Sequence, residues 1–178
     1  MKLLIASDIH GSFYYCSRLI EAFKNEGADK LVLLGDILYH GPRNPLPCDY
    51  SPQKVAELLN SYRQNILCVK GNCDSEVDQM VLEFPIMVEF AVMMINNRLV
   101  YFTHGHKTDE MSARLNKGDI LIHGHTHLSV CEELQDYTYL NPGSVSLPKD
   151  NIHGYMIIED GSIVFKDIDS NPYRNYTI

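Results

Sequence analysis

The stretch that indicates the fold most strongly is Leu3-Leu4-Ile5-Ala6-Ser7-Asp8-Ile9-His10-Gly11. Its short apolar run is typical of a strand buried on both faces, and its polar end is typical of a loop at the carboxyl end of that strand. The pattern returns at 31–36, which ends in Gly35-Asp36, and at 66–74, which ends in Gly71-Asn72-Cys73-Asp74. Helices are expected between these strands, over 12–26 and from Ser51-Pro52 onward. Three strand–helix units in succession predict a sheet with its functional residues gathered at one edge.

The second half of the chain is richer in strands. The turn-forming pairs Asn96-Asn97 and Asp160-Gly161 each separate two apolar runs, as in β-hairpins. The sequence therefore predicts an α/β (α+β) fold, with a two-sheet β-sandwich flanked by helices, in a single domain over 1–178. Residues 171–178 are polar, and we expect them to be loosely held. The strands expected in this half are 86–95, 99–103, 120–122, 129–133, 138–140, 155–158 and 163–168.

Charge and cysteine content bear on which partners and which cellular compartment the protein has. The chain of 178 residues has 23 acidic and 15 basic side chains, which gives a net charge of -8, so a stable nucleic-acid partner is not expected. The five cysteines form no C-x-x-C pair, which fits a reducing cytoplasm. Neither a secretion signal nor a membrane span is expected, because Asp8 and His10 interrupt the first apolar run. The apolar run 86–95 is a candidate edge for a homo-oligomer.

Histidine is concentrated in two short windows. Five of the eight histidines fall in 103–106 and 123–127, and each window follows an apolar run. Together with Asp8, His10, Asp36 and Asn72, they offer carboxylate, amide and imidazole donors without a thiolate, a mixture that suits Mn, Fe, Ni or Zn. These side chains offer more ligand atoms than one metal ion requires. Two ions that share a bridging carboxylate are a common device for hydrolysing phosphate esters.

These motifs, in this order and spacing, resemble the calcineurin-like metallophosphoesterases. The resemblance extends from residue 3 to about residue 148 and rests on Asp8-x-His10, Gly35-Asp36, Gly71-Asn72-x-Asp74, His104 and Gly124-His125-x-His127. Within that family, 41–45, 71–74 and Asn141-Pro142-Gly143-Ser144 are similar to the small bacterial YfcE-type phosphodiesterases.

The resemblance implies a ligand set and a mechanism. One metal ion would be held by Asp8, His10 and His127, and the other by Asn72, His104 and His125, with Asp36 as the bridge. The cofactors implied are two divalent ions, with manganese expected and zinc, iron or nickel as alternatives. A hydroxide held between the ions would attack the phosphorus of a small phosphodiester, and Asn72 would help to stabilise the charge that develops there.

One position departs from the family pattern. Many members have a histidine directly after the asparagine, as general acid for the leaving alkoxide, and this chain has Cys73 there. A thiol is a weaker hydrogen-bond donor, so His106 or a metal-bound water is a candidate substitute. His106 is equally a candidate for contacting the substrate phosphate or for a supporting hydrogen bond. Asp74 would orient Cys73 or cap the following helix, and Arg43 would clamp a phosphate or hold its loop together.

The sequence therefore predicts a metal-dependent phosphodiesterase of the class that hydrolyses phosphoric esters. Two alternatives stay open: a phosphomonoesterase or phosphoprotein phosphatase of the same fold, and a non-catalytic interaction scaffold like the retromer subunit of this fold. The intact set of donor residues disfavours the scaffold.

Overall fold

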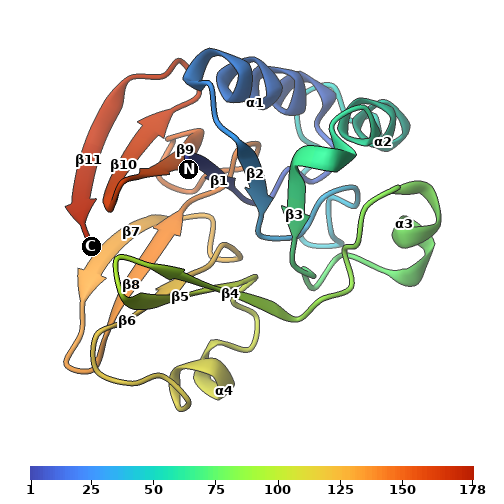
Figure 1. The fold of residues 1–178 in the computed structure, drawn as a ribbon. Helices are drawn as coiled ribbons and strands as arrows, with labels where there is room; N and C mark the ends of the chain where they lie inside the picture. Colours follow the sequence, from blue (N-terminus) through green and yellow to red (C-terminus); the bar gives the residue numbers. More distant parts are fainter.

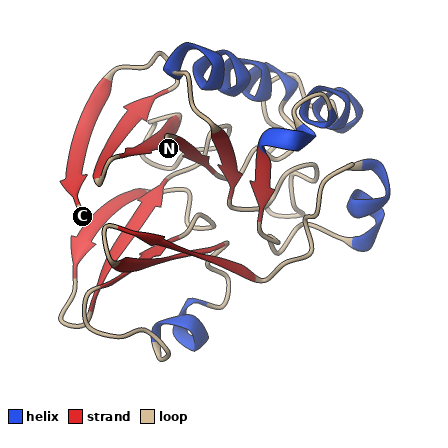
Figure 2. Ribbon diagram, in the orientation of Figure 1, coloured by secondary structure: helices blue, strands red, loops and turns tan.

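The computed structural model describes the backbone of residues 1–178 and every side chain except that of Asp109. Its elements form two β-sheets packed face to face, with helices on the outside (Figures 1 and 2). The helices are α1 (Phe13–Glu26), α2 (Pro52–Asn60), α3 (Glu76–Val81) and α4 (Thr108–Ser112), with a short 3-10 turn at Arg63–Asn65. The strands are β1 (Leu3–Ala6), β2 (Lys30–Leu33), β3 (Ile66–Cys68), β4 (Phe90–Ile95), β5 (Arg98–Thr103), β6 (Asp119–Ile122), β7 (Ser129–Glu133), β8 (Tyr137–Pro142), β9 (Gly154–Glu159), β10 (Ser162–Asp167) and β11 (Pro172–Thr177).

The first sheet has the order β11-β10-β9-β1-β2-β3, and the second has the order β4-β5-β6-β8-β7. Strands β1, β2 and β3 are parallel, and so are β5, β6 and β8. The carboxyl ends of parallel strands lie at one edge of their sheet, so each sheet presents several loops at the same edge. The expected sandwich of two sheets with outer helices is confirmed.

Two apolar layers hold these elements together. One layer lies between the first sheet and the helices α1 and α2, and the other fills the space between the sheets. Helix α1 begins where the Ser12 side chain accepts a hydrogen bond from the backbone of Tyr15, and it ends at Gly27 in the left-handed conformation. Strand β1 is buried along its whole length, as its uninterrupted apolar run predicts.

One expected strand limit and the expectation for residues 171–178 are wrong. The strand expected from Ile86 begins only at Phe90, because the backbone at Ile86 and Val88 is bonded instead to Gln79 and Lys70. Residues 171–178 are not loosely held: 172–177 form β11, which pairs with β10. Tyr173 and Tyr176 of β11 pack against the apolar layer between the sheets, and this packing stabilises the strand. The polar composition of 171–178 gave no signal for it.

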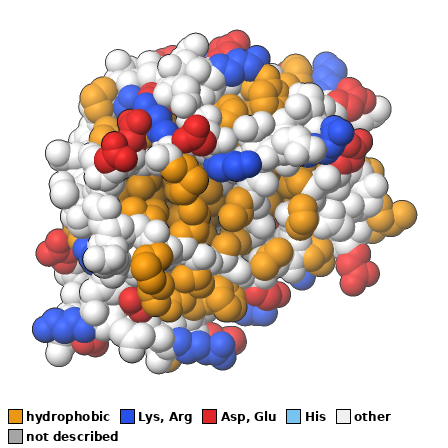
Figure 3. Space-filling view, in the orientation of Figure 1, with side chains coloured by type: hydrophobic (Ala, Val, Ile, Leu, Met, Phe, Trp, Pro, Cys, Tyr) orange, Lys and Arg blue, Asp and Glu red, His pale blue; other side chains and the backbone are white. Residues whose placement is uncertain are grey.

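Strand β4 lies at the edge of the second sheet, and its alternate residues Phe90, Val92 and Met94 are exposed. Figure 3 shows hydrophobic side chains gathered on the face where Figure 1 places β4 and β5. An oligomer contact at this strand stays a prediction. Among the described residues, no helix combines the length and apolar character that crossing a bilayer requires.

Candidate metal centre

The donor residues expected from the sequence follow strands of both sheets. Asp8 and His10 follow β1, Asp36 follows β2 and Asn72 follows β3, whereas the two histidine windows follow β5 and β6 of the other sheet. The structure brings these loops together. Strand ends that are far apart in the chain therefore form one cluster of carboxylate, amide and imidazole groups.

Asp8, His10 and His127 form one half of this cluster. The Nε2 atoms of His10 and His127 are 3.1 Å apart, and Asp8 Oδ1 lies 3.5 Å from the first and 3.3 Å from the second. All three side chains are buried. Their donor atoms lie close enough together to hold one metal ion.

The other half contains His104, His125 and Asn72. His104 Nε2 lies 3.0 Å from Asn72 Oδ1 and 3.2 Å from His125 Nδ1. Asp36 lies between the halves, with its Oδ2 atom 3.8 Å from His10 Nε2 and 3.4 Å from His104 Nε2. The carboxylate of Asp36 is thus within reach of a ligand nitrogen on either side.

Backbone carbonyls fix the direction in which three of the imidazoles point. The Nδ1 atom of His10 lies 2.8 Å from the carbonyl oxygen of Tyr39, that of His104 lies 2.7 Å from that of Leu34, and that of His127 lies 2.7 Å from that of Leu147. A carbonyl only accepts, so each Nδ1 donates its hydrogen and Nε2 is the nitrogen left to bind a metal ion. These Nε2 atoms all point into the cluster.

This arrangement fits a cation. The Nε2 atoms of His10 and His127 face each other at 3.1 Å, and Asp8 Oδ1, buried beside them, has no hydrogen-bond partner among the described residues. Acceptors that face acceptors in a buried site repel one another unless a positive charge lies among them. A divalent ion matches both the charge and the oxygen and nitrogen donors.

The electrostatics of the cluster also favour positive charge. Burial alone would raise the pKa of Asp8, but the imidazoles of His10, His127 and His104 outweigh it and hold the pKa well below its ordinary value. Burial lowers the pKa of His104, yet the carboxylates of Asp36 and Asp8 outweigh that effect and raise it to about 9. The cluster thus stabilises a proton strongly, and metal binding would compete with that proton.

The backbone is strained at these positions. Five of the expected ligands, which are not glycines, adopt a left-handed φ of 50 to 65°. Such strain persists where the surrounding structure imposes it and is concentrated at functional sites. A methyl group at Gly124 would lie 2.6 Å from Asp8 Oδ2, and one at Gly71 would lie 2.1 Å from Asp36 Oδ1. Glycine is therefore required for the close approach of these two loops to the carboxylates. The five strained residues are Asp8, His10, Asp36, His125 and His127.

Asp74 is connected to the site through the backbone. Its buried carboxylate accepts hydrogen bonds from the backbone N–H groups of Asp36, Ile37 and Gly71, at 2.8, 2.9 and 2.7 Å. It thereby joins the loop after β2 to the loop after β3. The alternative interpretation of Asp74 as a helix cap is wrong, because Ser75 caps α3.

Cys73 lies beside the Asp36 carboxylate. The backbone N–H of Cys73 donates to Asp36 Oδ1 at 2.8 Å, and its Sγ atom lies within 4.8 Å of donor atoms of His10 and Asp36. Burial and then the charge of Asp36 raise the pKa of this thiol to about 12. The thiol is therefore neutral near pH 7.

His106 and Arg43 lie at the periphery of the cluster. The ring centroid of His106 is 5.6 Å from that of His104, and its buried Nδ1 atom has no hydrogen-bond partner among the side chains that the structure describes. Burial, followed by the nearby charge of His104, lowers the pKa of His106, so its ring is neutral near pH 7. Arg43 lines a polar cavity of about 720 Å³ together with Asp36, Asn72, His125 and His127.

Two features of the site were not predicted from the sequence. Lys149 brings a second cationic side chain to the polar cavity, and the carbonyls of Leu34, Tyr39 and Leu147 orient the histidines. Neither has a local signal in the sequence, because a lysine in a loop is ordinary and every residue has a carbonyl.

Comparison with known proteins agrees with this geometry. The sequence profile of the calcineurin-like phosphoesterase superfamily domain matches residues 1–161. The chain belongs to this superfamily. Membership implies a requirement for divalent metal ions, which the donor cluster fits.

Among its relatives, phosphodiesterase YfcE of Escherichia coli strain K12 is 50% identical over 150 residues, which cover 84% of this chain and 82% of that protein. The solved structure of the E. coli phosphoesterase YfcE superposes with a TM-score of 0.92 over 100% of both chains, at 41% identity. The vacuolar protein sorting 29 structure from Cryptosporidium parvum has a TM-score of 0.66 at 19% identity, with 99% of this chain and 98% of that chain covered. At that identity it shares the fold alone.

Proposed function

We propose that this protein is a phosphodiesterase that hydrolyses small phosphodiesters with two divalent metal ions. The observation that carries the proposal is the cluster of inward-facing imidazole nitrogens around Asp8 and Asp36, in a chain that is 50% identical to phosphodiesterase YfcE over 150 residues. We assign one ion to Asp8, His10 and His127, the other to Asn72, His104 and His125, and the bridge to Asp36. Manganese is the expected ion, with zinc, iron or nickel as alternatives.

The bound ions would supply positive charge that lowers the pKa of a water molecule and balances charge on the phosphoryl oxygens. The residues of the chain do the rest. Arg43 and Lys149 line the polar cavity, where they attract and orient the anionic phosphodiester group. The Asn72 amide, which is exposed at the rim, is placed to donate to a phosphoryl oxygen as negative charge develops there.

Protonation of the leaving group needs a proton donor, and this chain lacks the histidine that serves many family members. Cys73 occupies the position from which family members protonate the leaving alkoxide, but a thiol with a pKa of about 12 releases its proton reluctantly. Good leaving groups need no such proton. We therefore expect aryl esters to be hydrolysed faster than alkyl esters. The candidate donors to the alkyl ester are Cys73, a metal-bound water and the protonated form of His106, which its lowered pKa makes scarce near pH 7.

Both sheets contribute to the cluster, so we further propose that residues 1–178 work as one domain. All five cysteines are free. Free thiols fit a reducing compartment, and the cytoplasm is the proposed location.

The test is a metal-by-metal activity screen on protein stripped of metal, with an aryl phosphodiester and the matching aryl phosphomonoester. We expect hydrolysis of the diester, stimulated by manganese, and an increase in the thermal midpoint on metal addition that His127→Ala reduces. Faster hydrolysis of the monoester would favour a phosphomonoesterase. If no metal stimulates hydrolysis and no metal shifts the thermal midpoint, the result favours a non-catalytic scaffold.

A further inference from the structure

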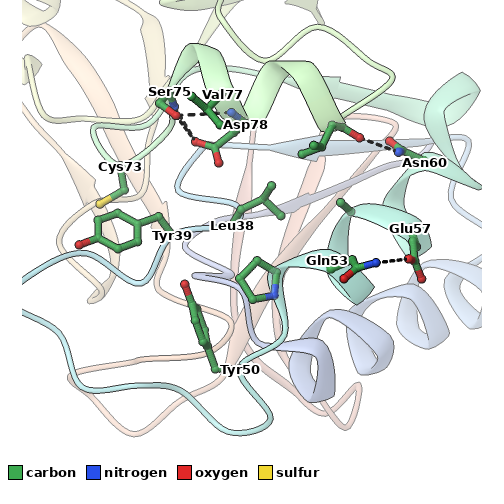
Figure 4. A pocket seen from close by; sticks show the side chains of 13 residues that line it. Leu38, Tyr39, Tyr50, Gln53, Glu57, Asn60, Cys73, Ser75, Val77 and Asp78 are labelled. Carbon is green, nitrogen blue, oxygen red and sulfur yellow. Dashed lines mark hydrogen bonds between the residues drawn. The ribbon is translucent and has the colours of Figure 1, made fainter.

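A second hollow, which we name the side pocket, adjoins the polar cavity of the metal centre. Its volume is about 590 Å³, and its walls come from the segment after β2, from α2 and from α3. Tyr39, Cys73 and Ser75 line both spaces, so the two are neighbours. Figure 4 shows Cys73 and Tyr39 at one end of the side pocket and Asn60 and Glu57 at the other.

The walls of the side pocket are largely hydrocarbon. Val77 and Val81 of α3 have exposed fractions of 69% and 52%. An occupant would cover part of this exposed apolar surface and gain the free energy of its removal from water. The apolar and aromatic residues of the walls are Leu38, Tyr39, Tyr50, Ala56, Val77 and Val81.

Several polar groups in the walls already have partners within the protein. Asn60 donates to the carbonyl of Val81 and accepts from the N–H of Glu83. Asp78 accepts from the backbone and the hydroxyl of Ser75. These groups have limited capacity left to hydrogen-bond a ligand, so an occupant would be recognised mainly by its shape and apolar surface.

The charges of the two spaces differ. Arg43 and Lys149 line the polar cavity, together with Asp36, a proposed metal ligand, and Asp74, whose carboxylate already accepts three backbone hydrogen bonds. Of the described residues that line the side pocket, none is Lys or Arg, and two are acidic, Glu57 and Asp78. A phosphate group is therefore favoured in the polar cavity and disfavoured in the side pocket.

We propose that the side pocket binds one uncharged, apolar ester group of the substrate, such as an aryl group, for which it has ample room. The inference rests on the proposed phosphodiesterase function and narrows its substrate class. The phosphodiester group occupies the polar cavity, and one organic group extends past Cys73 and Tyr39 between α2 and α3. Diesters whose organic groups carry carboxylates or further phosphates are poor substrates.

Two measurements on the manganese-loaded protein test this inference. The first compares kcat/KM for bis(para-nitrophenyl) phosphate with kcat/KM for its ring-carboxylated analogue. Val77→Lys adds a cation to the pocket wall, and Met80→Lys is the matched control, because Met80 lies on the same helix, is 84% exposed and does not line the pocket. We expect Val77→Lys to lower the preference for the substrate with uncharged rings over the ring-carboxylated substrate by about fivefold, and Met80→Lys to leave that preference unchanged.

The second measurement is independent of turnover. Diphenyl phosphate and dimethyl phosphate carry the same single charge, and only the first has groups that fill the side pocket. We expect diphenyl phosphate to bind about tenfold more tightly, read from ligand-induced shifts of the thermal midpoint.

The outcomes are separable. Equal binding of the two phosphates, or equal changes of preference in both lysine variants, overturns the role of the side pocket even in an active enzyme. Failure to hydrolyse any diester with any metal overturns the proposed function, and the binding comparison then still decides whether the pocket accepts an aryl group.

Discussion

Replacement of Asp74 by asparagine separates a structural role for this residue from a chemical one. Its carboxylate joins the loops that carry Asp36 and Asn72 through three backbone hydrogen bonds, and it is only 5% exposed. In Asp74→Asn, an amide oxygen replaces one carboxylate oxygen and an NH₂ group replaces the other. The NH₂ group cannot accept from the N–H group that it faces.

The arrangement that loses least keeps the amide oxygen at the Oδ2 position, where it still accepts from the N–H groups of Asp36 and Gly71. The N–H of Ile37 then loses its acceptor, which costs about 1–3 kcal/mol for a buried donor. Loss of the charge adds nothing to this cost, because burial and the nearby charge of Asp36 outweigh the backbone hydrogen bonds and raise the pKa of Asp74. We therefore expect a loss of about 1–3 kcal/mol in the free energy of unfolding.

The assay is urea unfolding of the metal-free protein, followed by activity at saturating manganese. Asp167→Asn is the matched control, because that carboxylate also accepts from two backbone N–H groups, of Asp169 and Asn171, but does so where water can replace it. We expect the control to lose less than about 1 kcal/mol. If Asp74→Asn lost no more stability than the control while its activity fell, Asp74 would act on Cys73 rather than on the loops.

Three further predictions concern other parts of the chain. Cys73→His should raise turnover of alkyl esters, because it replaces a thiol with a pKa of about 12 by a better acid; unchanged turnover would contradict this role. Burial alone raises the pKa of Glu26, but Lys166 and Tyr155 outweigh burial and lower the pKa overall. The stability that the carboxylate adds is therefore fully present above the unfolded pKa of 4.5, and it is lost as pH falls through the folded pKa. Glu26→Gln should therefore cost about 1–2 kcal/mol near pH 7 and progressively less as pH falls through the folded pKa of Glu26, measured by urea unfolding over a pH series, and a cost that does not change with pH would refute the reasoning. Deletion of 172–178 should lower the free energy of unfolding by at least about 2 kcal/mol, because β11 then no longer covers the apolar layer between the sheets; an unchanged thermal midpoint would show that β11 is dispensable.

Much of the fold was accessible from the sequence because its signals are local. The continuous apolar runs at 3–6 and 31–34 predict buried strands, and the turn pairs Asn96-Asn97 and Asp160-Gly161 have the left-handed φ values that their residue types favour. Strand β11 was not predicted because its sequence is polar. It is held by pairing with β10 and by two tyrosines that pack against the apolar layer between the sheets. Such contacts depend on which segments meet in three dimensions.

The candidate donors were likewise identified from the sequence, since Asp, Asn and His carry their ligand atoms wherever they lie. The sequence by itself therefore determined most of the strands and the set of candidate donor residues. The order of these residues along the chain determined the family. Only the tertiary structure decided how those donors are used. The carbonyl that orients His104 is that of Leu34, 70 positions away along the chain, and the N–H groups that bind Asp74 include two from the loop of another strand. The side pocket likewise exists only where α2 and α3 face each other beside Cys73. The direction of a lone pair, the shape of a hollow and the strain of a loop arise from contacts between segments distant in the chain, so they are set only when both sheets have formed.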